Sequence, residues 1–270
     1  MNDEAVSLAR NVADTSRRLN ILREYLQSLV LRSLHESEAF RCLAFVGGTA
    51  LRFLYQLPRF SEDLDFSLTQ TAGYEPAEWM AKVKRDLSLA GFNPLVSLND
   101  RKTVHVAWIK IGAVLKESGL AAMADQKLSI KLEIDTKPPE GAVTLNQVVE
   151  KHRMFVVRHY DQPSLMAGKL HALITRKYPK GRDWYDFIWY RAVRPPITPN
   201  LTLLQNALDQ TQGKGAMSAA GWPDHMTRRI AGLDMARIRD DVEPFLERDG
   251  DADLITRQNI LGLLPHPPAV

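Results

Sequence analysis

The sequence predicts an α+β protein, with a mixed sheet and flanking helices over residues 1–160 and a helical part over residues 161–270. Three observations predict this class. Short apolar or alternating runs of strand length occur only in the first part. Apolar residues at helical spacing occur in both parts. After Arg153–Val157, the last run that predicts a strand, residues 163–263 carry helical patterns alone.

The first part begins with helix and strand signals around a pair of glycines. An apolar stripe at three- and four-residue spacing predicts one long helix over residues 5–34. Leu43–Val46 is a short apolar run that stops at the glycine pair 47–48, which is typical of a buried strand. Thr49 is placed to cap a following helix over residues 50–56.

Alternating patterns predict the rest of the sheet. In residues 63–68 and 127–135, apolar side chains occupy every second position, so each strand buries one face and exposes the other. Between them, residues 76–91 have the proline start and glycine end of a helix. Residues 94–98 and 103–111 then form a predicted hairpin.

Composition sets wide limits on function. The net charge of +3 allows a nucleotide or nucleic-acid partner without requiring one. Cys42 is the only cysteine, which excludes a disulfide within the chain, and we expect it to be a small buried hydrophobe. No apolar run approaches the ~20 residues of a membrane span, and the N-terminus lacks the pattern of a secretory signal. We therefore expect a cytoplasmic protein.

Asp63 and Asp65 form the centre of the predicted site. On a strand, residues two apart project from one face, about 6–7 Å apart, and two such carboxylates repel unless a cation lies between them. Carboxylate oxygens are ligands that Mg²⁺ prefers. Glu133, on the polar face of the strand 127–135, would complete a three-carboxylate site if the two strands were neighbours. An isolated Asp-x-Asp pair is otherwise typical of a solvated polar face.

The glycine turn supplies the second part of the site. Gly47, Gly48 and Thr49 lie between a predicted strand and a predicted helix, where amides of a helix N-terminus can bind a triphosphate. Such turns also use glycine for steric reasons alone. No Gly-Lys-Ser/Thr follows, which excludes a P-loop. Clustered carboxylates beside such a turn suit nucleotidyl transfer, which needs metal charge on phosphate oxygens and a base for the incoming hydroxyl.

Four short motifs occur in order along the chain: Gly47–Arg52 with Arg59–Phe66, Lys131–Ile134, Lys169–Asp186, and Asp241–Leu246. They resemble the AbiEii/AbiGii toxin family of nucleotidyltransferases. The resemblance implies a nucleotidyltransferase fold with a helical C-terminal part, magnesium and a nucleoside triphosphate donor. Members of that family are toxins of type IV toxin–antitoxin systems, which implies a cognate antitoxin. Related toxins of the MenT type add nucleotides to the 3′ end of transfer RNA.

The residues and the resemblance together predict roles. Asp63 and Asp65 bind magnesium, Glu133 is a third ligand or the base, and Lys169 neutralises charge on the triphosphate. The residues expected to bind substrate are Gly47, Gly48, Thr49, Arg59, Ser61, Arg182 and Asp183.

Several of these residues have plainer interpretations. Lys169 lies on the apolar side of its predicted helix, so it either meets an anion or covers apolar surface with its amine in water. Arg59 and Ser61 could belong to a solvated loop. Asp183 and Asp186 could cap a helix, and Asp241 could be the N-cap of another.

The helical part is locally basic around several aromatic residues. That mixture suits a single-stranded RNA end, with phosphates on the cations and bases on the rings. The alternative is an aromatic core helix with a solvated basic face. The residues are Lys177, Tyr178, Lys180, Arg182, Trp184, Tyr185, Trp189, Tyr190, Arg191 and Arg194.

We expect transfer of a nucleoside monophosphate from a nucleoside triphosphate to the 3′ end of a transfer RNA. Motifs that hold phosphates and metal do not specify the acceptor, so nucleotidylation of a small molecule or protein is a rival interpretation. A third is a nucleotide- or RNA-binding regulatory module without turnover. Three clustered acids favour an enzyme, because a binding module has little need of them.

Overall fold

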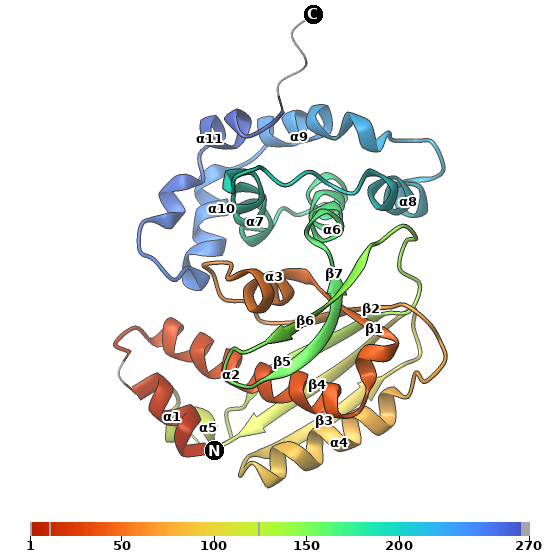
Figure 1. The fold of residues 1–270 in the computed structure, drawn as a ribbon. Helices are drawn as coiled ribbons and strands as arrows, with labels where there is room; N and C mark the ends of the chain where they lie inside the picture. Colours follow the sequence, from red (N-terminus) through yellow and green to blue (C-terminus); the bar gives the residue numbers. More distant parts are fainter. Residues whose placement is uncertain (1, 11, 124, 266–270) are drawn as a thin grey trace, which may run out of the picture. The chain divides into compact units, whose positions relative to one another are not determined.

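The chain forms two compact units, and a seven-stranded sheet organises the first of them (Figure 1). The structure, a computed structural model, describes residues 2–10, 12–123 and 125–265. The first unit consists of Met1–Pro138 and Thr144–His159. The second consists of Pro139–Val143 and Tyr160–Val270.

The first unit alternates helices with strands. Its elements are, in chain order, α1 (Asn2–Arg10), α2 (Thr15–Glu36), η1 (Ala39–Arg41), β1 (Leu43–Val46), α3 (Gly47–Tyr55), β2 (Leu64–Leu68), α4 (Pro76–Leu89), β3 (Asn93–Asn99), β4 (Val104–Gly112), α5 (Val114–Glu117), β5 (Leu128–Asp135), β6 (Thr144–Val149) and β7 (Phe155–Tyr160).

Both parallel and antiparallel pairs occur in the sheet. The strands lie in the order β3-β4-β5-β2-β1-β7-β6. β3 and β4 form the predicted antiparallel hairpin, and β4 also pairs antiparallel with β5. β2 pairs parallel with β5 and antiparallel with β1, and β1 pairs parallel with β7. A mixed sheet with flanking helices confirms the predicted α+β class.

The sheet is amphipathic, as its alternating sequence predicts. Burial alternates without exception along β5, where Leu128, Ile130, Leu132 and Ile134 are buried and the residues between them are half-buried. α2 packs against β5 and α4, and α4 packs against β3, which covers the apolar face (Figure 1). The polar side chains of β5 and β2 therefore project from the opposite face.

Three local predictions were wrong. Residues 5–34 form two helices rather than one, because Asp14 caps α2 by accepting a hydrogen bond from the Arg17 amide at 2.6 Å. The helix after β1 begins at Gly47 instead of residue 50. β6 and the short α5 were not predicted at all.

The second unit is helical in its described residues after β7, as the sequence predicts. α6 packs against α7, α8 and α9, and α7 packs against α10. The elements are α6 (Gln162–Thr175), α7 (Gly181–Ala192), α8 (Leu201–Gln212), η2 (Ala219–Gly221), α9 (Trp222–Ala231), α10 (Met235–Val242), η3 (Glu243–Phe245), η4 (Asp251–Leu254) and α11 (Arg257–Gly262).

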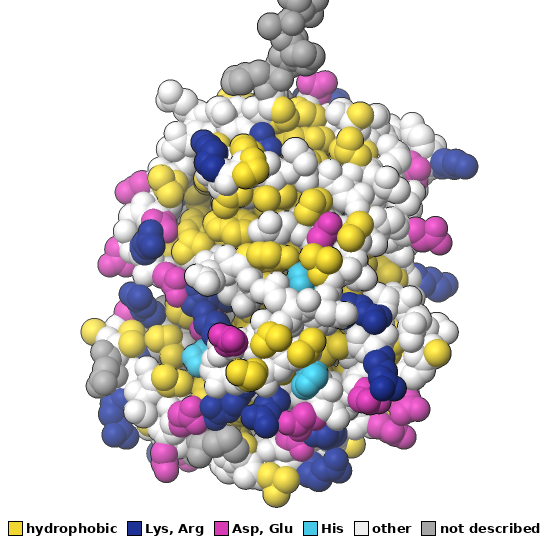
Figure 2. Space-filling view, in the orientation of Figure 1, with side chains coloured by type: hydrophobic (Ala, Val, Ile, Leu, Met, Phe, Trp, Pro, Cys, Tyr) yellow, Lys and Arg dark blue, Asp and Glu magenta, His cyan; other side chains and the backbone are white. Residues whose placement is uncertain are grey.

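Charged side chains of both signs are interspersed over the face drawn in Figure 2. This mixture agrees with the sequence, in which 35 Lys and Arg residues nearly balance 32 Asp and Glu residues. Across the described ranges, no helix is long and apolar enough to cross a membrane.

Candidate active site

The parallel pairing of β2 with β5 brings two of the predicted carboxylates side by side. Asp65 is the register partner of Glu133, so both side chains project from the same face of the sheet. Asp63 lies directly before the first residue of β2. Glu133 was expected to join the site only if these two strands were neighbours, and the observed register confirms that they are.

Lys131, which the sequence prediction did not include among the site residues, lies with these carboxylates. Its Nζ is 2.8 Å from Oε1 of Glu133. The hydrogen bond to Glu133 raises the pKa of Lys131 against the lowering effect of burial, and the negative charges of Asp63 and Asp65 raise it further. All three carboxylates therefore act on one ammonium group. Lys131 lies two residues before Glu133 on a strand whose side chains alternate between faces. This spacing could have predicted that the two side chains share a face.

The donor atoms of this cluster suit a hard divalent cation. Within the part of the chain that the structure describes, no group of three or more His, Cys, Asp or Glu side chains is arranged to hold a metal ion. Mg²⁺, however, usually takes only one or two carboxylates and completes its shell with water and substrate phosphates. The adjacent pair Asp65 and Glu133, with Asp63 beside it, fits that requirement.

The glycine turn lies directly against the carboxylate pair. Val46 is the register partner of Asp65, and the next residue, Gly47, begins α3 with φ of 79°. A Cβ atom at Gly47 would overlap the Asp65 carboxylate. Both the backbone angle and this contact require glycine. The amides at the start of α3 therefore adjoin the acidic site.

Gly48 packs against two of the predicted substrate residues. A Cβ atom there would lie 2.6 Å from Nη2 of Arg59 and 3.0 Å from Oγ of Ser61. Arg59 is only 1% exposed, and its Nη1 donates a hydrogen bond to the Phe60 carbonyl at 2.8 Å. The solvated-loop interpretation is therefore wrong for Arg59.

Thr49 does not cap a helix, which corrects the prediction. Its hydroxyl donates to the backbone carbonyl of Asp63, and its side chain is buried because α3 begins three residues earlier than predicted. The bond ties the first turn of α3 to the entry of β2. Gln27 of α2 holds the same segment, donating to the carbonyls of Ser61 and Glu62 at 3.1 and 2.8 Å. Gln27 could not be predicted as a site residue, since its partners are backbone atoms distant in the chain.

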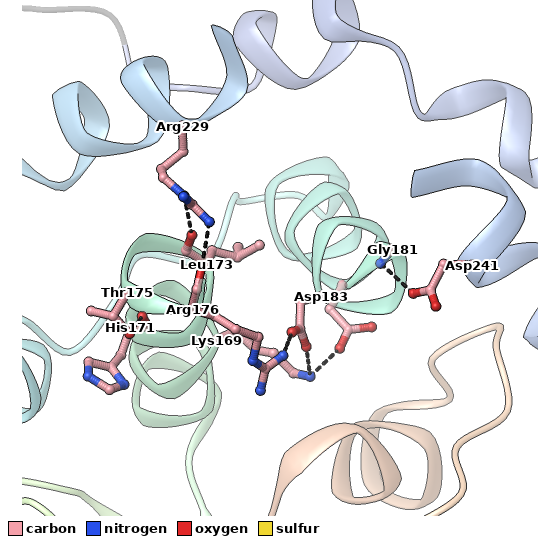
Figure 3. A network of polar contacts seen from close by, with 10 residues as sticks. Lys169, His171, Leu173, Thr175, Arg176, Gly181, Asp183, Arg229 and Asp241 are labelled. Carbon is pink, nitrogen blue, oxygen red and sulfur yellow. Dashed lines mark hydrogen bonds and ion pairs between the residues drawn. The ribbon is translucent and has the colours of Figure 1, made fainter. Parts of the chain in front are cut away.

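In the second unit, Lys169 lies between two acidic side chains (Figure 3). Its Nζ is 2.8 Å from Asp183 and 2.8 Å from Asp186, which is fully buried. Asp183 also pairs with Arg176. An amine resting in water is therefore the wrong description of Lys169. Asp183, in the first turn of α7, and Asp186 both pair with cations.

Asp241 stabilises the start of α7. The predicted role of Asp241 as the N-cap of the helix that follows it is wrong, because Asp241 lies inside α10. It lies in the last turn of α10, and its Oδ2 accepts a hydrogen bond from the Gly181 amide at 2.6 Å (Figure 3). A Cβ atom at Gly181 would overlap the Ile238 carbonyl, so the glycine permits close packing of the two helices. Arg182 lies over the Phe245 ring, 4.3 Å from its centroid.

Residues 29–258 match the protein family described as the nucleotidyl transferase AbiEii toxin of type IV toxin–antitoxin systems. The chain belongs to this family. As an AbiEii protein it is a nucleotidyltransferase, which implies a nucleoside triphosphate substrate and an antitoxin partner. No curated protein matches the chain.

Two solved structures resemble this AbiEii protein. JHP933 of Helicobacter pylori superposes with a TM-score of 0.53 at 19% identity, covering 91% of this chain and 90% of that chain. This likeness concerns the fold alone. A candidate nucleotidyltransferase of H. pylori gives a TM-score of 0.45 at 22% identity, over 91% and 97% of the respective chains.

Most rings of the predicted RNA-binding mixture are buried in the AbiEii fold. Trp184, Tyr185 and Tyr190 are at most 4% exposed and belong to the core of the second unit. For these three rings the core-helix interpretation is confirmed, and they cannot stack on bases. Tyr178, by contrast, is 67% exposed, with the Lys177 ammonium 5.3 Å from its ring centroid.

Proposed function

We propose that this AbiEii protein transfers a nucleoside monophosphate from a nucleoside triphosphate to the 3′-hydroxyl of a transfer RNA, with magnesium, in the cytoplasm. One observation carries the proposal. Gly47 lies against the Asp65 carboxylate, and Asp65 is paired in register with Glu133. A turn suited to donor phosphates thus adjoins a carboxylate pair suited to a metal and an attacking hydroxyl.

Each residue of the first unit has a role in this proposal. Asp63 and Asp65 would hold the magnesium ion, which when bound supplies positive charge to the phosphate oxygens, and Glu133 beside them is a third ligand or the base. Gly48 and Thr49 hold the donor phosphates through the amides at the start of α3. Arg59 and Ser61 lie behind Gly48 and fix the turn against which the phosphates rest.

Glu133 accepts the proton of the attacking hydroxyl. The hydroxyl oxygen forms a bond to the α-phosphorus, and the bond from that phosphorus to the bridging oxygen breaks. Pyrophosphate leaves with the electron pair of the broken bond. Lys131 is ion-paired with Glu133, so its ammonium holds the Glu133 carboxylate in place beside Asp65.

The helical part completes the proposal. We assign residues 1–160 as the nucleotidyltransferase domain with its N-terminal helix and residues 161–270 as a helical C-terminal domain. Lys169 neutralises triphosphate charge, and Arg182 and Asp183 contact substrate. In the structure the Lys169 ammonium is held by its ion pairs with Asp183 and Asp186.

Incubation with each labelled nucleoside triphosphate and total RNA, followed by a gel, tests the proposal. We expect label in the transfer RNA band, and we expect Asp65→Asn to reduce it at least about a hundredfold, because a neutral amide cannot replace the lost charge at the site. The variant should keep its fold and lose toxicity on expression. Asp100→Asn, at an exposed hairpin turn, is the matched control and should retain activity.

Other outcomes of the gel assay contradict the proposal. Label in a protein band or a small molecule would favour the rival acceptors. Triphosphate binding without any labelled product, together with persistent toxicity of Asp65→Asn, would favour a binding module. Full activity of a folded Asp65→Asn variant would remove the carboxylate site itself.

A further inference from the structure

Trp108 presents an exposed aromatic ring on the polar face of the sheet. It lies on β4 and is 40% exposed, whereas Trp79 of the same unit is 4% exposed. Leu95 of β3 is also exposed, at 53%, and its register partner Lys110 lies two residues from Trp108 on the same face. A ring of this size left in water beside another exposed apolar side chain is typical of a binding surface.

The ring is connected to the carboxylate site through Lys131. Trp108 is the register partner of Lys131, so both project from the same face. The Lys131 ammonium lies 6.0 Å from the centroid of the indole and 2.8 Å from Oε1 of Glu133. One cation thus bridges the aromatic surface and the group proposed as the base.

The order of strands places Trp108 away from the donor turn. Along the sheet, β4 is followed by β5, β2 and β1. The glycine turn follows β1, Asp65 lies on β2, and Glu133 lies on β5. The donor phosphates and Trp108 are therefore on opposite sides of the carboxylates. Because the attacking and leaving oxygens of a phosphoryl transfer lie roughly in line, a donor bound at the glycine turn would place the attacking hydroxyl on the Trp108 side.

We infer that Trp108 stacks on the terminal base of the RNA that accepts the nucleotide. This inference rests on the proposed function and names the part of its site that holds the acceptor. Aromatic side chains stack on any base, because each base has a π-face. Lys110, exposed on the same face of β4, supplies a cation for the adjoining phosphate.

Binding of two transfer RNAs tests the inference without requiring turnover. One carries its natural 3′ end, and the other has an abasic last nucleotide; both carry a 5′ fluorophore for anisotropy. Trp108→Ala should weaken binding of the natural RNA by about tenfold, the scale of one base stacked on an aromatic ring, and should leave the abasic RNA unaffected. Trp108→Phe should restore most of the affinity. Leu89→Ala, which removes an 80% exposed apolar side chain of α4, is the control.

The inference is overturned if Trp108→Ala weakens both RNAs equally, weakens neither, or instead raises the KM of the nucleoside triphosphate. Its failure differs from that of the proposed function. RNA that binds in a Trp108-dependent manner but never receives a nucleotide contradicts only the transfer proposal. RNA that receives nucleotides with unchanged affinity in the Trp108→Ala variant contradicts only the role of Trp108.

Discussion

Gly48 has no room for a side chain because two polar groups lie behind it. A Cβ atom would lie 2.6 Å from the Arg59 guanidinium, and Arg59 cannot move freely because it is buried and hydrogen-bonded to the Phe60 carbonyl. We therefore predict that Gly48→Ala leaves the protein folded but weakens triphosphate binding about ten- to a hundredfold, the effect of losing one or two hydrogen bonds to a charged group. Calorimetry measures the affinity.

Gly112→Ala is the matched control for that substitution. Its added Cβ would make only ordinary contacts at 3.8 Å with Asn93. Equal donor affinity in Gly48→Ala, Gly112→Ala and the wild type would mean that the turn is only a bend in the chain. Of the two glycines, Gly47 has the left-handed backbone angle, so the effect of Gly48→Ala is due to the added side chain and not to backbone strain.

The sequence predicts the carboxylates of the site better than the residues that hold the glycine turn in place. Asp65 and Glu133 could be predicted because alternation along a strand fixes which side chains share a face. Burial of Arg59 could not be predicted, because a residue in a loop has no periodicity. The place of Trp108 beside Lys131 could not be predicted, because it depends on the register of β4 with its neighbouring strands.

Between elements, Lys169 of α6 holds two acidic residues of α7. Removing the ammonium leaves the fully buried Asp186 carboxylate without that cation. We therefore predict that Lys169→Met lowers the free energy of unfolding by about 3 kcal/mol or more, as when one partner of a buried ion pair is removed. If Lys169 also acts on the triphosphate, turnover should fall by more than about a hundredfold.

A double variant separates these two effects. Lys169→Met with Asp186→Asn removes both charges, so stability should largely return. Turnover that stays low in the stable double variant supports a role in the chemistry. Turnover that returns with stability assigns Lys169 to the packing of α6 against α7 alone. Denaturation and steady-state kinetics on the same samples measure both.

A second buried charge, Glu24, joins α2 to α3. Its Oε2 is 2.5 Å from Nε of Arg52 and 3.2 Å from Nζ of Lys151, and its Oε1 is 3.3 Å from Nε2 of His152. Burial raises the pKa of Glu24, but the hydrogen bond from His152 and the charge of Arg52 outweigh it and lower the pKa to about 2. Arg52, part of the first family motif, thus positions the helix that carries the glycine turn.

The sign of this shift sets a pH dependence. The lowered pKa means that the ionised Glu24 stabilises the fold fully above the ordinary pKa of 4.5, and that this contribution is lost as the pH falls towards about 2. We predict that Glu24→Gln is less stable than the wild type by on the order of 3 kcal/mol at neutral pH. The difference should shrink across that acid range. Urea unfolding of both proteins measures it.

Glu38→Gln is the control for Glu24→Gln, because Glu38 and its ion-pair partner Arg41 both have exposed side chains. It should change stability little at any pH. A stability difference for Glu24→Gln that stays constant from neutral pH to about 2 would contradict the assigned shift.

Element prediction succeeded where side chains alternate between core and solvent. β5 shows this most clearly, with every second residue buried. β6 has mostly exposed side chains, so its sequence TLNQVV carries no alternation to detect. The break between α1 and α2 was missed because the apolar stripe of α2 obscured the capping signal of Asp14.

At the scale of the whole molecule, the family match extends over both units. It covers residues 29–258, which include the carboxylates of the sheet and the ion pairs of Lys169. The motifs of the second unit are built on close packing, as at Gly181, and on buried charge, as at Asp186. Both features stabilise the packing of the helices, independently of any contact of these residues with substrate.

Residues 139–143 belong to the helical unit although the chain returns to the sheet after them. The carbonyls of Glu140 and Gly141 accept hydrogen bonds at 2.8 Å from the side-chain amides of Asn206 and Asn200. During synthesis, this short peptide leaves the ribosome well before α8, so its hydrogen bonds to Asn200 and Asn206 form only after α8 has been made. A gene divided at codon 160 would therefore encode an incomplete helical unit, because residues 139–143 of that unit are encoded before the division.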